Sequence, residues 1–263
     1  MLNDLSPAAT FIAYNYNTPV DTAAFEAEAR RILAEVEGEL GWMYETWHPH
    51  CDHPQRVKAR INYTVWSYVF VCPDCGVELV LWEIAVDDES RRVSKSFSCS
   101  DCGGGLSKGD LIRATETIYD STLETVLHRA KRKPVLINYQ LGNSRLEKAP
   151  DLFDLSLLEP IATQSSAHFY PTRRIEDDID LWYERDYRSL GIYTVDAFFT
   201  KRSLILTSFL WDRARKTSDS RLRAALVAWI QSVTMGFSLL NRYLKNAFSQ
   251  VNRILSGTLY VGS

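Results

Sequence analysis

Four of the five cysteines occur as two closely spaced pairs, and this spacing is typical of a metal site. The pairs read Cys72-Pro-Asp-Cys75-Gly and Cys99-Ser-Asp-Cys102-Gly, with 23 residues between them. A gap of two residues lets both sulfurs of a pair reach one ion at about 2.3 Å, and the following glycine permits the tight turn beneath them. The sequence therefore predicts a four-thiolate zinc ribbon with Cys72, Cys75, Cys99 and Cys102 as ligands.

Zinc at such a site would be structural, because four thiolates leave no coordination position for water. Two other interpretations stay open, namely two unrelated cysteine pairs and a redox dithiol, although a redox pair usually occurs singly at the start of a helix. The fifth cysteine, Cys51, lies in the segment His48-Pro-His50-Cys51-Asp-His53. That segment is either a second metal site or a polar loop.

The composition is that of an ordinary globular protein. The chain has 263 residues, of which 46% are apolar and 24% are charged. These values exclude disordered and collagen-like chains. No apolar run approaches the length of a membrane span, and no basic segment followed by an apolar stretch opens the sequence. We therefore expect a cytoplasmic protein without a membrane partner, in which cysteines serve as thiols or metal ligands.

Charge is unevenly distributed along the chain. The net charge is −3, but residues 91–148 carry five more cations than carboxylates and residues 196–263 carry seven more. Such asymmetry points to a polyanionic partner, and solvated helix faces would give the same pattern.

Hydrophobic patterning predicts helices at both ends and strands in the middle. A Ser-Pro start precedes an apolar stretch from residue 8, and a second helix is expected over residues 21–40 with Asp21 as its N-cap. Strands are expected at residues 61–71, 77–85, 96–98 and 133–139. Helices are then expected over residues 198–216, 221–237 and 238–248, and a last strand follows from residue 257.

Motifs of common enzyme classes are absent from the sequence. It contains no GxGxxG, P-loop, GxSxG or HExxH pattern and no Pro-Pro pair. No catalytic residue is therefore predicted. Tryptophans such as Trp66 and Trp82 lie in apolar patterns that indicate core positions.

Several blocks of the chain, in order, resemble one enzyme family. The opening segment from Asp4 to Asp21 (DLSPAATFIAYNYNTPVD) resembles the region that follows the cofactor motif in large bacterial DNA methyltransferases of the N-4/N-6 (amino) group. The resemblance continues through INYTVWS, both cysteine pairs, PVLINY, GIYTV, FTKR and SGTLYV. It spans nearly the whole chain.

The resemblance implies a role for Asp4. In that family a glycine-rich loop holds S-adenosylmethionine, and an acidic residue after the next strand accepts its ribose hydroxyls; Asp4 matches that residue. The glycine-rich loop and the catalytic (Asp/Asn/Ser)-Pro-Pro-(Tyr/Phe) motif, which contacts the flipped base, are both absent here. We therefore expect the middle portion of such an enzyme. It would be inactive alone, would contribute to S-adenosylmethionine binding only in the complete enzyme, and could be complemented by a chain that supplies the missing motifs.

By the same resemblance, this portion is expected to recognise double-stranded DNA as part of a restriction–modification or phage-defence methyltransferase. Cations near the ribbon and at the start of a C-terminal helix suit phosphate contacts, which position a protein on the duplex. Each of them could equally be an ordinary solvated cation. The predicted DNA-binding residues are Lys108, Arg129, Lys131, Arg132, Lys133, Lys201 and Arg202.

The expected fold is mixed α/β with three segments. Residues 1–42 would be a helical remnant of a Rossmann-like cofactor domain, residues 43–150 a β-rich zinc-ribbon module, and residues 151–263 a loop-rich and then mainly helical region for target recognition or scaffolding. The alternative function is that of a non-enzymatic zinc-ribbon protein that binds nucleic acid or acts as an adaptor.

Overall fold

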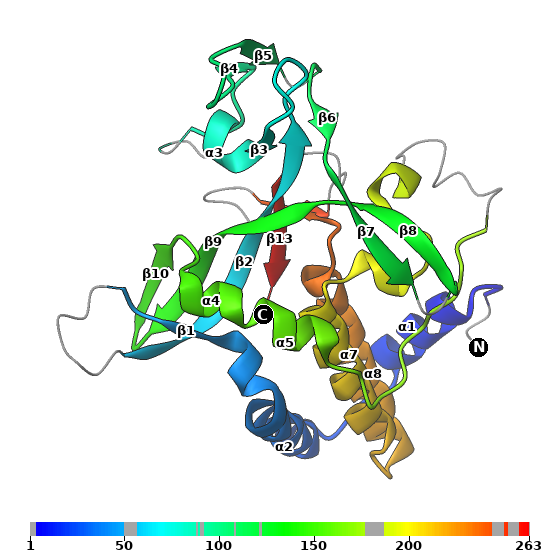
Figure 1. Ribbon diagram of the computed structural model, residues 1–263. Helices are drawn as coiled ribbons and strands as arrows, with labels where there is room; N and C mark the ends of the chain where they lie inside the picture. The colour runs from blue at the N-terminus through cyan, green and yellow to red at the C-terminus, as the bar shows by residue number, and fades with distance from the viewer. Residues whose placement is uncertain are drawn as a thin grey trace.

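The chain folds into a mixed α/β structure with a large antiparallel sheet, a bundle of helices at one end and a small ribbon at the other (Figure 1). The computed structural model describes residues 4–49, 57–87, 89, 92–107, 109–120, 123–176, 187–243, 250–251 and 258–262. The mixed α/β class is thus confirmed. Every strand pairing within these ranges is antiparallel, and the Rossmann-like remnant stays a prediction.

The helices have the following bounds: α1 Pro7–Asn17, α2 Thr22–Leu40, α3 Leu81–Ala85, α4 Leu152–Ser156, α5 Leu158–Thr163, α7 Lys201–Arg215 and α8 Ser220–Thr234. The strands are β1 Glu45–Trp47, β2 Lys58–Val71, β3 Glu78–Val80, β4 Ser96–Ser98, β5 Gly105–Ser107, β6 Ile112–Arg113, β7 Thr115–Asp120, β8 Thr125–Ala130, β9 Arg132–Leu141, β10 Ser144–Lys148, β11 Asn241–Arg242, β12 Gln250–Val251 and β13 Thr258–Gly262.

Both expected N-terminal helices are confirmed, with the caps that the sequence indicates. The Ser6 side chain accepts a hydrogen bond from the Ala9 backbone N–H at the start of α1. Asp21 accepts hydrogen bonds from the backbone N–H groups of Ala23 and Ala24 at the start of α2. Such caps satisfy donors that have no partner within the helix.

Strand β2 is the central element of the sheet. Along one edge it pairs in turn with β1, β13 and β3, and along the other with β9 and β6. Its 14 residues therefore extend from the main sheet into the ribbon. Because both edges are paired, this strand links the two parts through a continuous set of backbone hydrogen bonds.

The prediction of a strand over residues 77–85 is wrong in its second half. Pairing with β2 stops at Val80, which lies opposite Val69, and residues 81–85 form helix α3. A longer β3 would have to pair Trp82 with Ser67, but that edge is occupied by Thr258 of β13. The chain instead turns into a helix that buries Leu81 and Ala85, four residues apart.

The C-terminal helices are shorter than expected. Residues 196–198 form a 3₁₀ turn before α7, and residues 235–237 form another after α8. The prediction of a helix over residues 238–248 is wrong for the residues that the structure describes, because Asn241 and Arg242 form β11. The Asn241 side chain donates to the carbonyl of Ser238, a contact that favours a turn there. Residues 244–249 lie outside the described ranges.

The largest apolar core lies between the helices. Residues from α2, α7 and α8 form one buried cluster, which includes Ile32, Phe209, Leu226 and Ile230, each no more than 1% exposed. Helix α2 from the predicted first segment and α7 from the third thus share one core. None of the described helices combines the length and the hydropathy that crossing a membrane requires.

Candidate metal centre and candidate nucleic-acid residues

The four cysteines of the two pairs meet at one point. All four sulfurs lie within 4.8 Å of one another. The Cys72 and Cys102 sulfurs are 3.9 Å apart, and those of Cys75 and Cys99 are 3.7 Å apart. Four sulfurs placed tetrahedrally at about 2.3 Å from zinc would be about 3.8 Å apart. The cluster therefore has the size and ligand chemistry of a structural zinc site, and could hold such an ion.

Two turns of the same geometry present these sulfurs. In the first turn the Gly76 N–H donates to the Cys72 carbonyl, and the Cys72 N–H donates to the Val77 carbonyl. In the second turn, Gly103 and Cys99 make the same two hydrogen bonds, the latter to Gly104. The glycines have φ angles of 76° and 74°, which residues with a Cβ rarely adopt. The glycine after each pair is therefore required by the backbone.

The ribbon around this cluster consists of residues 72–113. The hairpin β2–β3 carries the first cysteine pair and β4–β5 carries the second, while β6 pairs with the upper end of β2. Each pair has one buried and one exposed cysteine, Cys72 and Cys99 being buried and Cys75 and Cys102 exposed. In the described part of the ribbon, Leu79 and Leu106 join the two buried cysteines in the buried core, and partly buried apolar side chains pack against it, namely Val77, Ile84, Phe97 and Leu111.

The electrostatics of the cluster favour a divalent cation. The backbone N–H groups of Cys102 and Asp101 point at the Cys99 sulfur and lower the pKa of its thiol to about 7. The Val77 backbone N–H acts to lower the pKa of the Cys75 thiol, but desolvation and the neighbouring thiols outweigh it and raise that pKa to about 12. A cation with two positive charges removes this conflict because it stabilises all four thiolates.

The second candidate metal segment is described only at its start. His48 lies with its Nδ1 atom 2.7 Å from the Tyr139 hydroxyl. His50, Cys51 and His53 lie outside the described residues. Within the described part of the chain, the four-cysteine cluster is the group of side chains that could hold a metal ion.

Two of the predicted DNA-binding residues are paired with carboxylates. The Arg129 Nε and Nη2 atoms donate to one Glu116 oxygen at 2.8 and 2.6 Å. The Lys131 Nζ atom donates to both oxygens of Glu78, at 2.8 and 2.6 Å. Because Glu78 lies on β3 and Lys131 precedes β9, this pair joins the ribbon to the sheet. Any contact of these cations with DNA would compete with the carboxylates.

The other predicted cations differ in exposure. Lys133 on β9 is exposed, and Lys201 at the start of α7 is half-buried. Burial lowers the pKa of Arg132 and of Arg202, although neither loses its charge near neutrality. The Arg202 guanidinium lies 5.3 Å from the centre of the Tyr44 ring. Lys108 lies outside the described residues.

Asp4 is exposed and caps the turn before α1. Its Oδ1 atom accepts a hydrogen bond from the Ser6 backbone N–H at 2.8 Å. Asp4 lines neither the pocket that contains Thr64 nor the pocket that contains Lys58. One exposed carboxylate does not make a cofactor site, and the described residues near Asp4 therefore do not by themselves fit S-adenosylmethionine.

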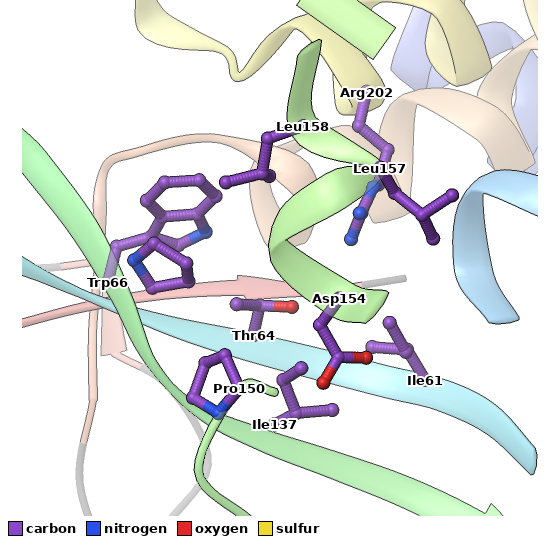
Figure 2. Close-up of a pocket in the computed structure, with 10 residues that line it drawn as sticks. Ile61, Thr64, Trp66, Ile137, Pro150, Asp154, Leu157, Leu158 and Arg202 are labelled. Atoms are coloured by element: carbon purple, nitrogen blue, oxygen red, sulfur yellow. The ribbon is translucent and has the colours of Figure 1, made fainter. Parts of the chain in front are cut away.

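A pocket that sequence reasoning missed lies between the sheet and helices α4 and α5 (Figure 2). Thr64 of β2, Asp154 of α4 and Arg202 of α7 line it. These residues are far apart in the sequence and form no motif. Of the three, only Arg202 was predicted from the sequence to be a functional residue. In comparisons with protein-family models, curated proteins and solved structures, no match to this chain was found.

Proposed function

We propose that this chain is the DNA-recognition and scaffold portion of an S-adenosylmethionine-dependent DNA amino-methyltransferase, acting on adenine N6 or cytosine N4. The observation that carries the proposal is the four-cysteine cluster at the end of β2. It lies in the part of the chain where the resemblance to such enzymes includes both cysteine pairs, and its geometry suits a closed, structural zinc site. Zinc would fix the ribbon on the central strand and do no chemistry.

DNA contacts are assigned to the body of the molecule rather than to the ribbon. Residues 72–113 contain eight carboxylates and five cations, and a zinc ion with four thiolates adds two further negative charges. The ribbon surface would therefore repel a phosphate backbone. Of the predicted cations, Lys133 and Lys201 suit phosphate contacts best. Arg129 and Lys131 are paired with carboxylates, and burial disfavours the charge of Arg132 and Arg202. Lys133 and Lys201 have no ion pair within the described part of the chain.

The acidic ribbon also favours the second candidate function, a zinc-ribbon adaptor that binds another protein. A surface with this charge would attract a basic protein surface more readily than a nucleic acid. The two candidates differ in a measurable way, since only the first requires salt-dependent binding of duplex DNA.

A salt titration of duplex binding tests the proposal on zinc-loaded protein. Each phosphate contact contributes about 0.9 to the slope of log K against log salt. We expect the substitutions Lys133→Gln and Lys201→Gln each to lower the slope by about 1. Arg215→Gln, which removes an exposed cation at the far end of α7, serves as the matched control and should leave the slope unchanged.

The outcomes separate the candidates. A steep slope that falls in the two lysine variants supports the recognition role, and methylation assays with fragments that carry the missing motifs would then test the complete enzyme. Absence of duplex binding by protein that contains about one zinc ion per chain would overturn it in favour of the adaptor.

A further inference from the structure

The segment that contains helix α1 takes no part in the buried cores of the molecule. We call residues 4–20 the arm. None of the residues of α1 is buried, and the arm contributes to none of the apolar clusters that the described residues form. Leu5, Ile12 and Tyr16 are exposed to solvent. Packing of an apolar face supplies most of the stability of helices in proteins, so the arm lacks the contribution that holds α2, α7 and α8.

The sequence of α1 gives this helix little stability of its own. It has 11 residues, and isolated helices shorter than about 12–15 residues are marginal in water. It contains no charged residue, so it has neither ion pairs between successive turns nor charges of its own that oppose the helix dipole. We therefore expect α1 to be helical only while it contacts the rest of the chain, so that its undocking and its unfolding are one event.

One side chain of α8 makes the polar contacts that hold the arm. The Arg221 guanidinium donates to the Asn15 side-chain oxygen at 2.7 Å and to the backbone carbonyl of Asn15 at 3.3 Å. It also donates to the carbonyls of Thr18 at 2.6 Å and Pro19 at 3.0 Å. Its central carbon lies 5.2 Å from the centre of the Tyr14 ring. A cation in this position also complements the negative end of the α1 dipole.

Arg221 has no substitute in this role. Within the described part of the chain, the arm makes no other hydrogen bond or ion pair with a residue distant in the sequence. Hydrogen bonds from a charged donor are stronger than those between neutral groups. The balance between the docked and the released arm therefore depends on this one side chain.

We propose that the arm is a detachable element that docks on α8 and leaves it as a unit, with Arg221 setting the balance between the two states. Docked, it is the helix of Figure 1, where α1 lies beside α8. Released, it is an unfolded segment that stays joined to α2, and the helical core remains intact because that core contains no residue of the arm. The inference goes beyond the proposed function and does not rest on it, since it requires neither zinc nor DNA.

Hydrogen exchange measured by mass spectrometry on the full chain tests this device. The amides of α1 should exchange at least about tenfold faster than those of α7, because local opening needs less free energy than global unfolding. Arg221→Gln should accelerate exchange in α1 by a further tenfold or more, roughly the loss expected for charge-assisted hydrogen bonds, and leave α7 unchanged. Arg223→Gln is the matched control on the same helix. Its side chain donates to the carbonyls of Thr217 and Ser218, so α1 should exchange as in the wild type.

A second variant breaks the arm itself. Ala13→Pro places a proline inside α1, which removes a backbone hydrogen bond and should unfold the arm. We expect α2, α7 and α8 to keep the exchange protection of the wild type in this variant. Loss of protection throughout the bundle in Ala13→Pro or Arg221→Gln would overturn the proposal, because the arm would then be an integral part of the core. Unchanged α1 exchange in Arg221→Gln, or wild-type α1 amides that exchange only by global unfolding, would overturn it as well.

Discussion

The ribbon and the helical bundle solve the problem of stability in different ways. The bundle of α2, α7 and α8 encloses an extensive apolar cluster with fully buried residues such as Phe209 and Leu226. The ribbon buries few side chains around its cysteines, chiefly Leu79 and Leu106. A core this small rarely balances the conformational entropy of its chain without a cross-link or metal. The difference indicates that the bundle is held by packing, whereas the ribbon would depend on an ion held by its four cysteines.

The largest expected effect is that of metal removal on the ribbon. Structural zinc binding contributes about 10–16 kcal/mol in small zinc domains, so chelation or Cys99→Ser should unfold the two hairpins that carry the cysteines. Hydrogen exchange should show rapid exchange there and unchanged protection in α7 and α8. Ser100→Ala, an exposed neighbour in the same turn, is the control and should retain zinc. If the ribbon stayed protected from hydrogen exchange without metal, it would not differ from the bundle in its source of stability.

The converse experiment disturbs the bundle. Phe209 is 1% exposed, and Phe209→Ala should lower the free energy of unfolding by about 3–5 kcal/mol because it leaves a cavity. Urea denaturation measures this loss, while the zinc content of the folded protein should not change. Val233→Ala on α8, where the side chain is 37% exposed, should cost less than about 1 kcal/mol. Zinc loss in the folded Phe209→Ala protein would show that the two regions are not independent.

One kind of substitution should have opposite signs in the two regions. Gly38 lies inside α2, and an added Cβ would meet nothing within 4 Å, so Gly38→Ala should stabilise the protein by about 0.5–1 kcal/mol. Gly76 also has open space, but its φ is 76°, so Gly76→Ala should destabilise the ribbon by about 1 kcal/mol. Urea denaturation and zinc affinity, respectively, measure the two effects. If Gly38→Ala and Gly76→Ala changed stability in the same direction, backbone strain at the Gly76 turn would be refuted.

The smallest expected effect is a pH dependence of the bundle. The pKa values of Glu28 and Asp212 lie below their ordinary values. A hydrogen bond from Arg31 lowers the pKa of Glu28. Burial acts to raise the pKa of Asp212, but Lys216, His168 and Arg213 outweigh it. Depressed pKa values contribute stability above the unfolded-state values near 4, and this contribution is lost as the pH falls through the folded-state values. Unfolding measured from pH 6 to pH 3 should show this decline. Asp212→Asn should make it shallower, and an unchanged pH profile in that variant would contradict the assignment.

Local patterns were sufficient to predict much of this molecule. The two cysteine pairs predicted the four-cysteine cluster, because each pair with its glycine forms the same turn from local hydrogen bonds. Neighbouring residues likewise determine the helix caps at Ser6 and Asp21 and the β-branched strand β2. Interactions over a few residues have a low entropic cost, so they leave a readable pattern.

The remaining features depend on residues that are distant in the sequence. Residues 81–85 form a helix because Thr258 of β13 occupies the edge of β2 that a longer β3 would need. Glu78 pairs with Lys131 across the ribbon boundary. The pocket lined by Thr64, Asp154 and Arg202 exists only because β2, α4 and the start of α7 converge. No local pattern encodes these contacts, because they are decided by which surfaces become available once the sheet and the helical core have formed.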